Sequence, residues 1–277
     1  MLCLVTQLPN GIDTSVPHPA RVYDYWLGGK DNFAADRRAA EAGYKAFPGV
    51  VQAAHANRAF LGRVVRYLVA ETGIRQFLDV GSGLPAASNT HEIAQEKAPE
   101  SRVVYVDIDP VVVAHARVLL RSAPEGKTDF LQADARDPAS VLAQAAAALD
   151  FDQPVAVLLL GVLHDYPDDA QVAAVTGAFA AALAPGSCLA VSHLAGDIQP
   201  ETVLRFALTM GAHGLPPGAL RSRDQVAALF AGLDLVDPGV VPVSRWHPDT
   251  DQEAAALIPV WGAVARKPGR EPGAGRR

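Results

Sequence analysis

Residues 75–86 read R-Q-F-L-D-V-G-S-G-L-P-A, and this stretch decides the fold. The apolar residues Phe77, Leu78 and Val80 are typical of a buried parallel strand, which Gly81 and Gly83 then end. A helical pattern resumes near Asn89, which opens a capping box. A strand, a glycine turn and a helix present backbone N–H groups to a ligand, because glycine has no Cβ to hold that ligand away. The stretch therefore predicts a ligand site at the carboxyl end of the first strand.

Two classes of cofactor bind at such a turn, and Asp79 helps to separate them. Gly81-x-Gly83-x-x-Ala86 fits the pattern with which dinucleotide-binding folds hold a pyrophosphate at a helix N-terminus. Asp79 lies two residues before the first glycine, where its charge would repel a pyrophosphate but suit a cationic amino-acid group. Pro85 also argues against dinucleotide binding at this loop. The D-x-G-x-G sequence resembles motif I of class I S-adenosylmethionine (SAM) methyltransferases, whose loop contacts the methionine end of SAM. A nicotinamide-dependent oxidoreductase stays open as the alternative.

Two further strands are predicted to end in an acidic residue. Residues 103–108 read V-V-Y-V-D-I, and Asp107 follows Gly83 by 24 residues, a position suited to accepting both hydroxyls of a ribose. Residues 128–134 read T-D-F-L-Q-A-D and end in Asp134. This second acid suits the amino group of an adenine, although a loop acid without a ligand role fits the spacing nearly as well.

The remaining strands complete a predicted sheet of seven. They are expected at residues 155–160, 188–194, 233–241 and 259–267. The run 155–160 is wholly apolar, which is typical of a central strand covered on both faces. The predicted fold is α/β, a doubly wound, Rossmann-like seven-stranded sheet whose last strand is antiparallel.

The segment before the sheet combines aromatic residues with glycines. Residues 1–17 are expected to form a flexible leader, and residues 18–47 concentrate aromatics around Gly28-Gly29 in a chain that is only 6% aromatic. An amphipathic helix is predicted over 50–71. Residues 18–70 are therefore expected to form a helical cap, which either packs its aromatics on the core as a hairpin or lines and covers the ligand site.

A histidine follows the central strand. His164 belongs to L-H-D-Y-P-D-D at 163–169, at the edge where open α/β sheets place their chemistry. A neutral imidazole beside Asp165 is a candidate general base. The alternative is a histidine that bonds a neighbouring loop, with Asp165 or Asp168 capping the next helix.

The last third contains a segment rich in glycine and proline at 197–221, which is expected to be an insertion that lines the substrate site. Residues 268–277 are rich in Gly, Pro and Arg and are expected to be disordered.

Composition excludes several classes of function. The chain has 277 residues, 49% hydrophobic, with a net charge of −6, which argues against nucleic acid as a general partner. Cys3 and Cys188 are the only cysteines, so neither a disulfide framework nor a cysteine metal site is expected, and no metal site is predicted. The N-terminus lacks the features of a signal peptide, and no apolar run reaches a membrane-spanning length. We expect a soluble, cytoplasmic protein without a membrane partner.

A longer resemblance lies in the N-terminal block. P-H-P-A-R-V-Y-D-Y-W-L-G-G-K-D-N-F-A-A-D-R at 17–37 looks like the signature of a bacterial S-adenosyl methyltransferase family, formerly a domain of unknown function. N-R-A-F-L at 57–61 and R-S-R-D-Q-V-A-A-L-F at 221–230 also fit that family. The resemblance covers roughly residues 17–267 and implies the class I methyltransferase fold, with SAM as ligand and S-adenosylhomocysteine as product.

A shorter resemblance concerns the possible base. L-H-D-Y-P-D-D is similar to the H-D-W-x-D segment of small-molecule O-methyltransferases, whose histidine deprotonates the acceptor hydroxyl, with Tyr166 in place of the tryptophan. On that match His164 would be the catalytic base.

Together these observations predict a SAM-dependent methyltransferase of the EC 2.1.1 class that acts on a small or medium acceptor. O-methylation is the candidate reaction. A SAM-binding regulator without turnover is a further alternative. The expected cofactor contacts are Asp79, Gly81, Ser82, Gly83, Asp107, Ile108, Asp134, Ala135 and Gly161. The candidates for a lid or substrate-lining role are Tyr23, Trp26, Gly29, Lys30, Asn32, Arg58, Arg205, Met210 and His213.

Overall fold

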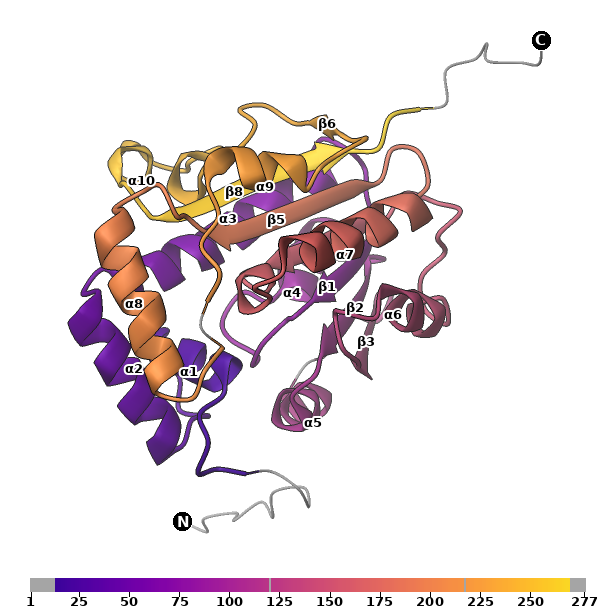
Figure 1. Cartoon of the computed structure of the whole chain (residues 1–277). Coiled ribbons are helices and arrows are strands. Elements are labelled where there is room, and N and C mark those ends of the chain that lie inside the picture. Colours follow the sequence, from indigo (N-terminus) through magenta and orange to yellow (C-terminus); the bar gives the residue numbers. More distant parts are fainter. Residues whose placement is uncertain (1–12, 120, 217, 270–277) are drawn as a thin grey trace.

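An eight-stranded sheet forms the centre of the molecule (Figure 1). The computed structural model describes residues 13–119, 121–216 and 218–269. Most of the predicted leader, residues 1–12, and residues 270–277 of the predicted tail lie outside the described residues.

The strand order is β3-β2-β1-β4-β5-β8-β6, and β7 also pairs with β8. The strands are β1 (Gln76–Val80), β2 (Arg102–Asp107), β3 (Lys127–Gln132), β4 (Ala156–Leu160), β5 (Cys188–Leu194), β6 (Asp234–Leu235), β7 (Val241–Pro242) and β8 (Val260–Arg266). The pairs among β1 to β5 are parallel, whereas β8 runs antiparallel to β5, β6 and β7. The doubly wound α/β sheet with a reversed C-terminal strand is confirmed.

The predicted count of seven strands is wrong by one. The expected strand 233–241 is two short strands, β6 and β7, that pair with the same strand β8 at different positions. Between them the chain turns at Pro238 and Gly239, and Gly239 has a φ of +78°. Proline has no N–H to donate to the ladder, so the pairing is interrupted there.

Helices cover both faces of the sheet. The α-helices are α1 (Pro19–Trp26), α2 (Ala34–Ala46), α3 (Val50–Ala70), α4 (Thr90–Lys97), α5 (Pro110–Leu119), α6 (Pro138–Ala145), α7 (Asp169–Ala182), α8 (Pro200–Ala212), α9 (Arg223–Ala228) and α10 (Asp251–Ala255). Short 3-10 helices are η1 (Leu163–Asp165) and η2 (Val243–Arg245). In Figure 1, α6, α7 and α9 lie in front of the sheet, and α3 and α4 lie behind it.

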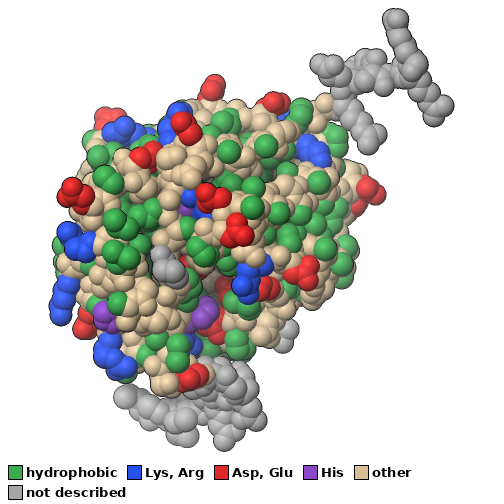
Figure 2. Space-filling view, in the orientation of Figure 1, with side chains coloured by type: hydrophobic (Ala, Val, Ile, Leu, Met, Phe, Trp, Pro, Cys, Tyr) green, Lys and Arg blue, Asp and Glu red, His purple; other side chains and the backbone are tan. Residues whose placement is uncertain are grey.

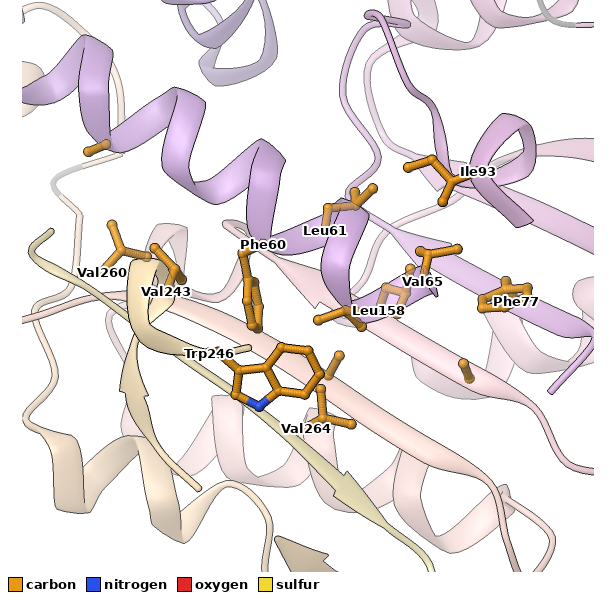
Figure 3. Packing of buried hydrophobic residues seen from close by; sticks show 14 of the residues in the cluster. Phe60, Leu61, Val65, Phe77, Ile93, Leu158, Val243, Trp246, Val260 and Val264 are labelled. Atoms are coloured by element: carbon orange, nitrogen blue, oxygen red, sulfur yellow. The ribbon is translucent and has the colours of Figure 1, made fainter. Parts of the chain in front are cut away.

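The strands bury alternate residues against these two layers. Phe77 packs with α3 and α4, whereas Leu78 and Val80 pack with α6, α7 and α9. On the α3 side, the rings of Phe60 and Trp246 meet edge to face at 5.5 Å between centroids (Figure 3). Strands buried on both faces explain the continuous apolar runs in the sequence.

Three helices form a cap beside the sheet. Figure 1 shows α1, α2 and α8 together at one side of the molecule, with the start of α3 next to them. The segment 197–221, expected as an insertion that lines the substrate site, contains the 13-residue helix α8. The guanidinium of Arg205 donates to the carbonyl of Ala46 at 2.9 and 3.1 Å, and the rings of Trp26 and Phe206 lie 5.8 Å apart. These contacts hold α8 against α1 and α2.

None of the helices in the described ranges combines the length and apolarity that crossing a membrane requires.

Candidate active site

A cavity of about 550 Å³ lies where the carboxyl ends of the central strands meet the cap. Its volume is within the range of about 300–1,000 Å³ that is usual for small-ligand sites. One side is made by the residues that follow β1, β2, β3 and β4, and the other by α1, α3 and α8. Open α/β sheets bind ligands at this edge.

The glycine turn after β1 approaches the cavity closely. Gly81 and Gly83 have φ values of +74° and +67°, a conformation that favours glycine. A Cβ on Gly81 would lie 2.6 Å from a methyl carbon of Val162, whereas a Cβ on Gly83 would meet no atom within 4 Å. Gly81 is therefore required for packing on the β4 loop, while Gly83 leaves open space beside a prospective ligand.

The N–H groups of this turn are already used inside the protein. Those of Gly81 and Ser82 donate to the carbonyl of Val106, and that of Gly83 donates to Oδ2 of Asp107 at 2.9 Å. The expectation that the turn presents free N–H groups to a ligand is therefore wrong. In addition, α4 begins only at Thr90, so no helix N-terminus stands at the turn to hold a pyrophosphate.

Asp79 is buried at the end of β1. Its Oδ2 accepts a 2.6 Å hydrogen bond from the hydroxyl of Thr90, and the residue lines the cavity. Burial raises the pKa of Asp79 to about 6, against the lowering effects of Thr90 and Arg58. Because burial disfavours the ionised form of this carboxylate, a cation beside it would be strongly favoured.

Asp107 ends β2 and also lines the cavity. One carboxylate oxygen accepts from the N–H of Gly83 and the other from the N–H of Asp109, both at 2.9 Å. Burial raises the pKa of Asp107, and the two backbone donors oppose that rise. Each oxygen retains a lone pair, so the carboxylate is fixed in orientation and can still accept hydrogen bonds. Ile108 beside it is half exposed in the cavity wall.

Asp134 and Ala135 also line the cavity, beyond the end of β3. The carboxylate of Asp134 is held by Arg136, whose Nε donates at 2.9 and 3.0 Å. This hydrogen bonding holds the pKa of Asp134 below its usual value. The acid is therefore ionised and fixed in position.

His164 lies in η1, directly after β4, and lines the cavity. Its Nδ1 is buried and has no hydrogen-bond partner among the described residues, and its Nε2 is 3.8 Å from Oδ1 of Asp165. Burial lowers the pKa of His164, so the imidazole is neutral at pH 7. A proton on Nε2 facing Asp165 leaves Nδ1 as an acceptor.

Arg221 holds the loop that carries His164. The guanidinium is almost fully buried and donates to the carbonyls of Leu163 and Tyr166, on either side of His164. It also donates to Nε2 of His193 at 2.7 Å and pairs with Asp169 at 2.8 Å. Because arginine can only donate, Nε2 of His193 must accept, and Nδ1 carries the proton toward the carbonyl of Leu194. Burial lowers the pKa of His193 to about 3.

Gly161 separates His164 from a residue of the cap. A Cβ on Gly161 would lie 3.3 Å from Nδ2 of Asn57 and 3.9 Å from Cε1 of His164. Asn57 donates from Nδ2 to the hydroxyl of Tyr23, which itself donates to the carbonyl of Ala54 at 2.9 Å. Oδ1 of Asn57 is buried without a partner among the described residues. The sequence assigned no ligand role to Asn57, and the structure places it buried in the cavity wall.

The predicted lid residues divide into two groups. Those that line the cavity are Tyr23, Trp26, Arg58 and Met210. Those that lie outside its wall are Gly29, Lys30, Asn32, Arg205 and His213. Arg58 donates to the carbonyls of Ala87 and Ser88 and so ties α3 to the glycine loop.

The second group supports the cap instead. Asp24 accepts from the N–H of Asp31 at 3.0 Å and from Nδ2 of Asn32 at 2.8 Å, which closes the turn after α1. A Cβ on Gly29 would overlap Oδ1 of Asp24. Lys30 is exposed, and His213 bonds the carbonyl of Thr209 within α8.

His18 is a cavity residue that sequence reasoning missed. It caps α1, and its Nδ1 lies 3.1 Å from Oδ2 of Asp109, in the turn after β2. Arg21 and Asp36 form a buried pair beside it at 3.2 Å. The Pro17-His18-Pro19 sequence was visible, but nothing in it revealed that the cap contacts this turn.

An adenosyl ligand fits these residues better than a dinucleotide. Three acids stand at the ends of β1, β2 and β3, and open space lies beside Gly83. A dinucleotide would bring a pyrophosphate to a turn whose N–H groups are already donated and whose Asp79 is negative when ionised.

Comparison with known proteins agrees with this geometry. The chain matches the S-adenosyl methyltransferase family over residues 5–268. It is 42% identical to a DUF574 family protein from Streptomyces avermitilis, with a TM-score of 0.88, over 92% of this chain and 99% of that one. It is 41% identical to a proposed methyltransferase from Thermobifida fusca, with a TM-score of 0.86, over 95% of this chain and all of that one (100%).

A more distant likeness concerns the fold alone. An O-methyltransferase family protein from Burkholderia thailandensis is 15% identical, with a TM-score of 0.54, over 93% of this chain and 66% of that one. No curated protein matches the chain. On the family match and the two close structural relatives, the chain belongs to the S-adenosyl methyltransferase family and is a SAM-dependent methyltransferase.

Proposed function

We propose that this enzyme methylates a hydroxyl group of a small molecule and that His164 is the general base. The observation that carries the proposal is the position of His164, which lines the cavity and whose buried Nδ1 has no hydrogen-bond partner among the described residues. A buried acceptor without a partner is costly, so a ligand donor at this position would be strongly favoured. The hydroxyl of the acceptor is such a donor.

We further propose which residues hold SAM. Asp79 would receive its ammonium group, Asp107 its ribose hydroxyls and Asp134 its adenine amino group. The order of these acids along β1, β2 and β3 supports the assignment, since the three neighbouring strand ends match an extended ligand. When bound, SAM supplies a methyl group whose bond to the cationic sulfur breaks with the electron pair remaining on sulfur.

The protein itself would align the reacting groups, shield them from water and accept one proton. The cap lies over the strand ends, where it would align the reacting groups and shield them from water. The acceptor oxygen gains the methyl group and loses its proton, which Nδ1 of His164 takes. Because burial lowers the pKa of His164, the base is already neutral at pH 7 and ready to accept that proton.

The surface supports a small molecule rather than a nucleic acid as acceptor. The net charge is −6, and Figure 2 shows acidic and basic side chains interspersed over the visible face. Nucleic-acid binding generally needs a continuous basic patch.

The experiment is a comparison of wild type with His164→Ala and His164→Gln. We expect a drop in turnover of about 100-fold or more in both variants, in line with the usual contribution of a general base. Affinity for S-adenosylhomocysteine, measured by calorimetry, should stay unchanged. Wild-type turnover in either folded variant would remove the general-base role.

A further inference from the structure

The cavity wall has two chemically different halves. The half at the strand ends carries the acids Asp79, Asp107, Asp134 and Asp165. The half under the cap is apolar and comes from one face each of α3 and α8. On α8 this face is Val203, Phe206, Ala207 and Met210, at helical spacing.

Two polar groups of the cap half are bonded within the protein. The indole N–H of Trp26 donates to the carbonyl of Ala40 at 3.1 Å, and the hydroxyl of Tyr23 donates to the carbonyl of Ala54. Both residues therefore offer the cavity mainly their ring surfaces. Arg58 of α3 also lines the cavity, and its Nη2 donates to the carbonyls of Ala87 and Ser88.

A charged ligand group placed against the apolar face of α8 would lose its water without gaining a partner there. Transfer of an unpaired charge into apolar surroundings is among the most costly changes in a protein. A neutral apolar group gains instead, by about 25 cal/mol for each Å² of surface removed from water. The wall thus discriminates by charge as well as by shape.

Taking the proposed function as its basis, we propose that the cap half binds an uncharged, largely apolar acceptor through the faces of α3 and α8. The acceptor carries its reacting hydroxyl at the boundary between the halves, where Asn57, Gly161 and His164 meet. The buried Oδ1 of Asn57 provides a second acceptor there for a donor of the bound ligand.

The test compares two probes of the same skeleton, 2-naphthol and 6-hydroxy-2-naphthoate, which differ by one carboxylate. Binding of each is measured by calorimetry with and without saturating S-adenosylhomocysteine. We expect 2-naphthol to bind at least tenfold more tightly than the carboxylate. Equal or tighter binding of the carboxylate, or no binding of 2-naphthol, would overturn the proposal.

Matched variants on α8 locate the binding site. Ala207 is buried in the cavity wall, whereas Leu208 is exposed and lies outside that wall. Ala207→Phe fills the cap half and should weaken 2-naphthol binding at least tenfold, while Leu208→Phe should not change it. Unchanged 2-naphthol affinity in folded Ala207→Phe would contradict the assignment of the site.

Two controls separate this inference from the proposed function. Val203→Thr is nearly isosteric, so it tests the apolar wall even if Ala207→Phe fails to fold. We expect it to weaken 2-naphthol binding about threefold. Unchanged 2-naphthol affinity in this variant would count against the proposal. Affinity for S-adenosylhomocysteine should be the same in all variants. If S-adenosylhomocysteine failed to bind the wild type, the proposed SAM site would be refuted. The comparison of 2-naphthol with 6-hydroxy-2-naphthoate would still test the apolar acceptor site independently.

Discussion

The hydroxyl of Thr90, at the start of α4, donates a 2.6 Å hydrogen bond to the buried carboxylate of Asp79, at the end of β1. Asp79 is only 5% exposed, and its pKa is raised to about 6. A protein interior normally avoids an ionised group with so few partners. The carboxylate thus costs stability in the free protein, and a cationic ligand would offset that cost.

The first prediction concerns the stability of Asp79→Asn. The native pKa of Asp79 lies above the usual 3.8 of an aspartate, so the native state holds the proton more tightly and the free energy of unfolding falls as pH rises from about 4 to 6. The shift corresponds to a penalty of at most about 3 kcal/mol above pH 6. Asparagine is neutral, so the variant should be more stable than wild type at pH 8 and similar near pH 4. Urea unfolding at both pH values checks this, and a variant no more stable than wild type at pH 8 would refute it.

The second prediction concerns cofactor affinity. If the ammonium of SAM binds ionised Asp79, the affinity should rise about tenfold between pH 5 and pH 7, because the ionised fraction of a group with a pKa of about 6 rises by that factor. Asp79→Asn should bind SAM more weakly and lose this dependence. Calorimetry across the pH range is the measurement, and the same slope in both proteins would assign the titration to another group, such as Asp107.

A third prediction concerns Arg221. Lysine keeps the charge but has one nitrogen, so it cannot reach His193 and the carbonyls of Leu163 and Tyr166 together. Arg221→Lys should lower the free energy of unfolding by about 2–4 kcal/mol, since buried partners lose their bonds. It should also lower kcat at unchanged affinity for S-adenosylhomocysteine, because the loop that carries His164 is no longer fixed.

The matched control for Arg221 is its exposed partner. The Asp169 side chain is 65% exposed, so Asp169→Asn should cost less than about 1 kcal/mol. An Arg221→Lys variant with wild-type kcat would show that the guanidinium has only a structural role.

The fourth prediction uses the two adjacent glycines of the cap. Gly29→Ala would force its Cβ onto Oδ1 of Asp24 and break the bonds that Asp24 accepts from Asp31 and Asn32. We expect a loss of at least about 2 kcal/mol, from overpacking together with the lost hydrogen bonds. Gly28→Ala faces open space and suffers only from its φ of +80°, with an expected cost of about 1 kcal/mol. Thermal unfolding of the two variants measures these losses of stability. A larger loss in Gly28→Ala than in Gly29→Ala would contradict the proposed role of Asp24 in closing the turn.

Local patterns in the sequence were sufficient for the main sheet and for the acids at its strand ends. The capping boxes at Asn89 and Ser222 are present, and Asp109 accepts from the N–H of Val111 at the start of α5. These features depend on residues a few positions apart, which is why pattern and spacing revealed them.

Features that depend on distant residues were not visible. The segment 197–221 was expected as an insertion that lines the substrate site, but helix α8 within it was not predicted, and its apolar face becomes apparent only against the cap. The buried setting of Asn57 depends on Tyr23 and Gly161, and that of Arg221 on His193 and Asp169. No local signal marks such partners in a single sequence.

The same limit applies to the glycine turn. Its N–H groups were expected to be free, but Val106 and Asp107 on the neighbouring strand accept them. Only the pairing of β1 with β2 reveals this, and it explains why the dinucleotide alternative fails at a turn that fits its pattern.

The most direct test is a parallel calorimetric titration with SAM, S-adenosylhomocysteine, NAD and NADP, on wild type and Asp107→Ala. We expect the two adenosyl ligands to bind the wild type and neither dinucleotide to bind it. In Asp107→Ala the affinity for SAM and for S-adenosylhomocysteine should fall by at least about tenfold, since charge-assisted hydrogen bonds contribute about 1.5–3 kcal/mol. Binding of a dinucleotide, or unchanged affinity for SAM in the variant, would contradict the central claim that the acids at the strand ends hold SAM.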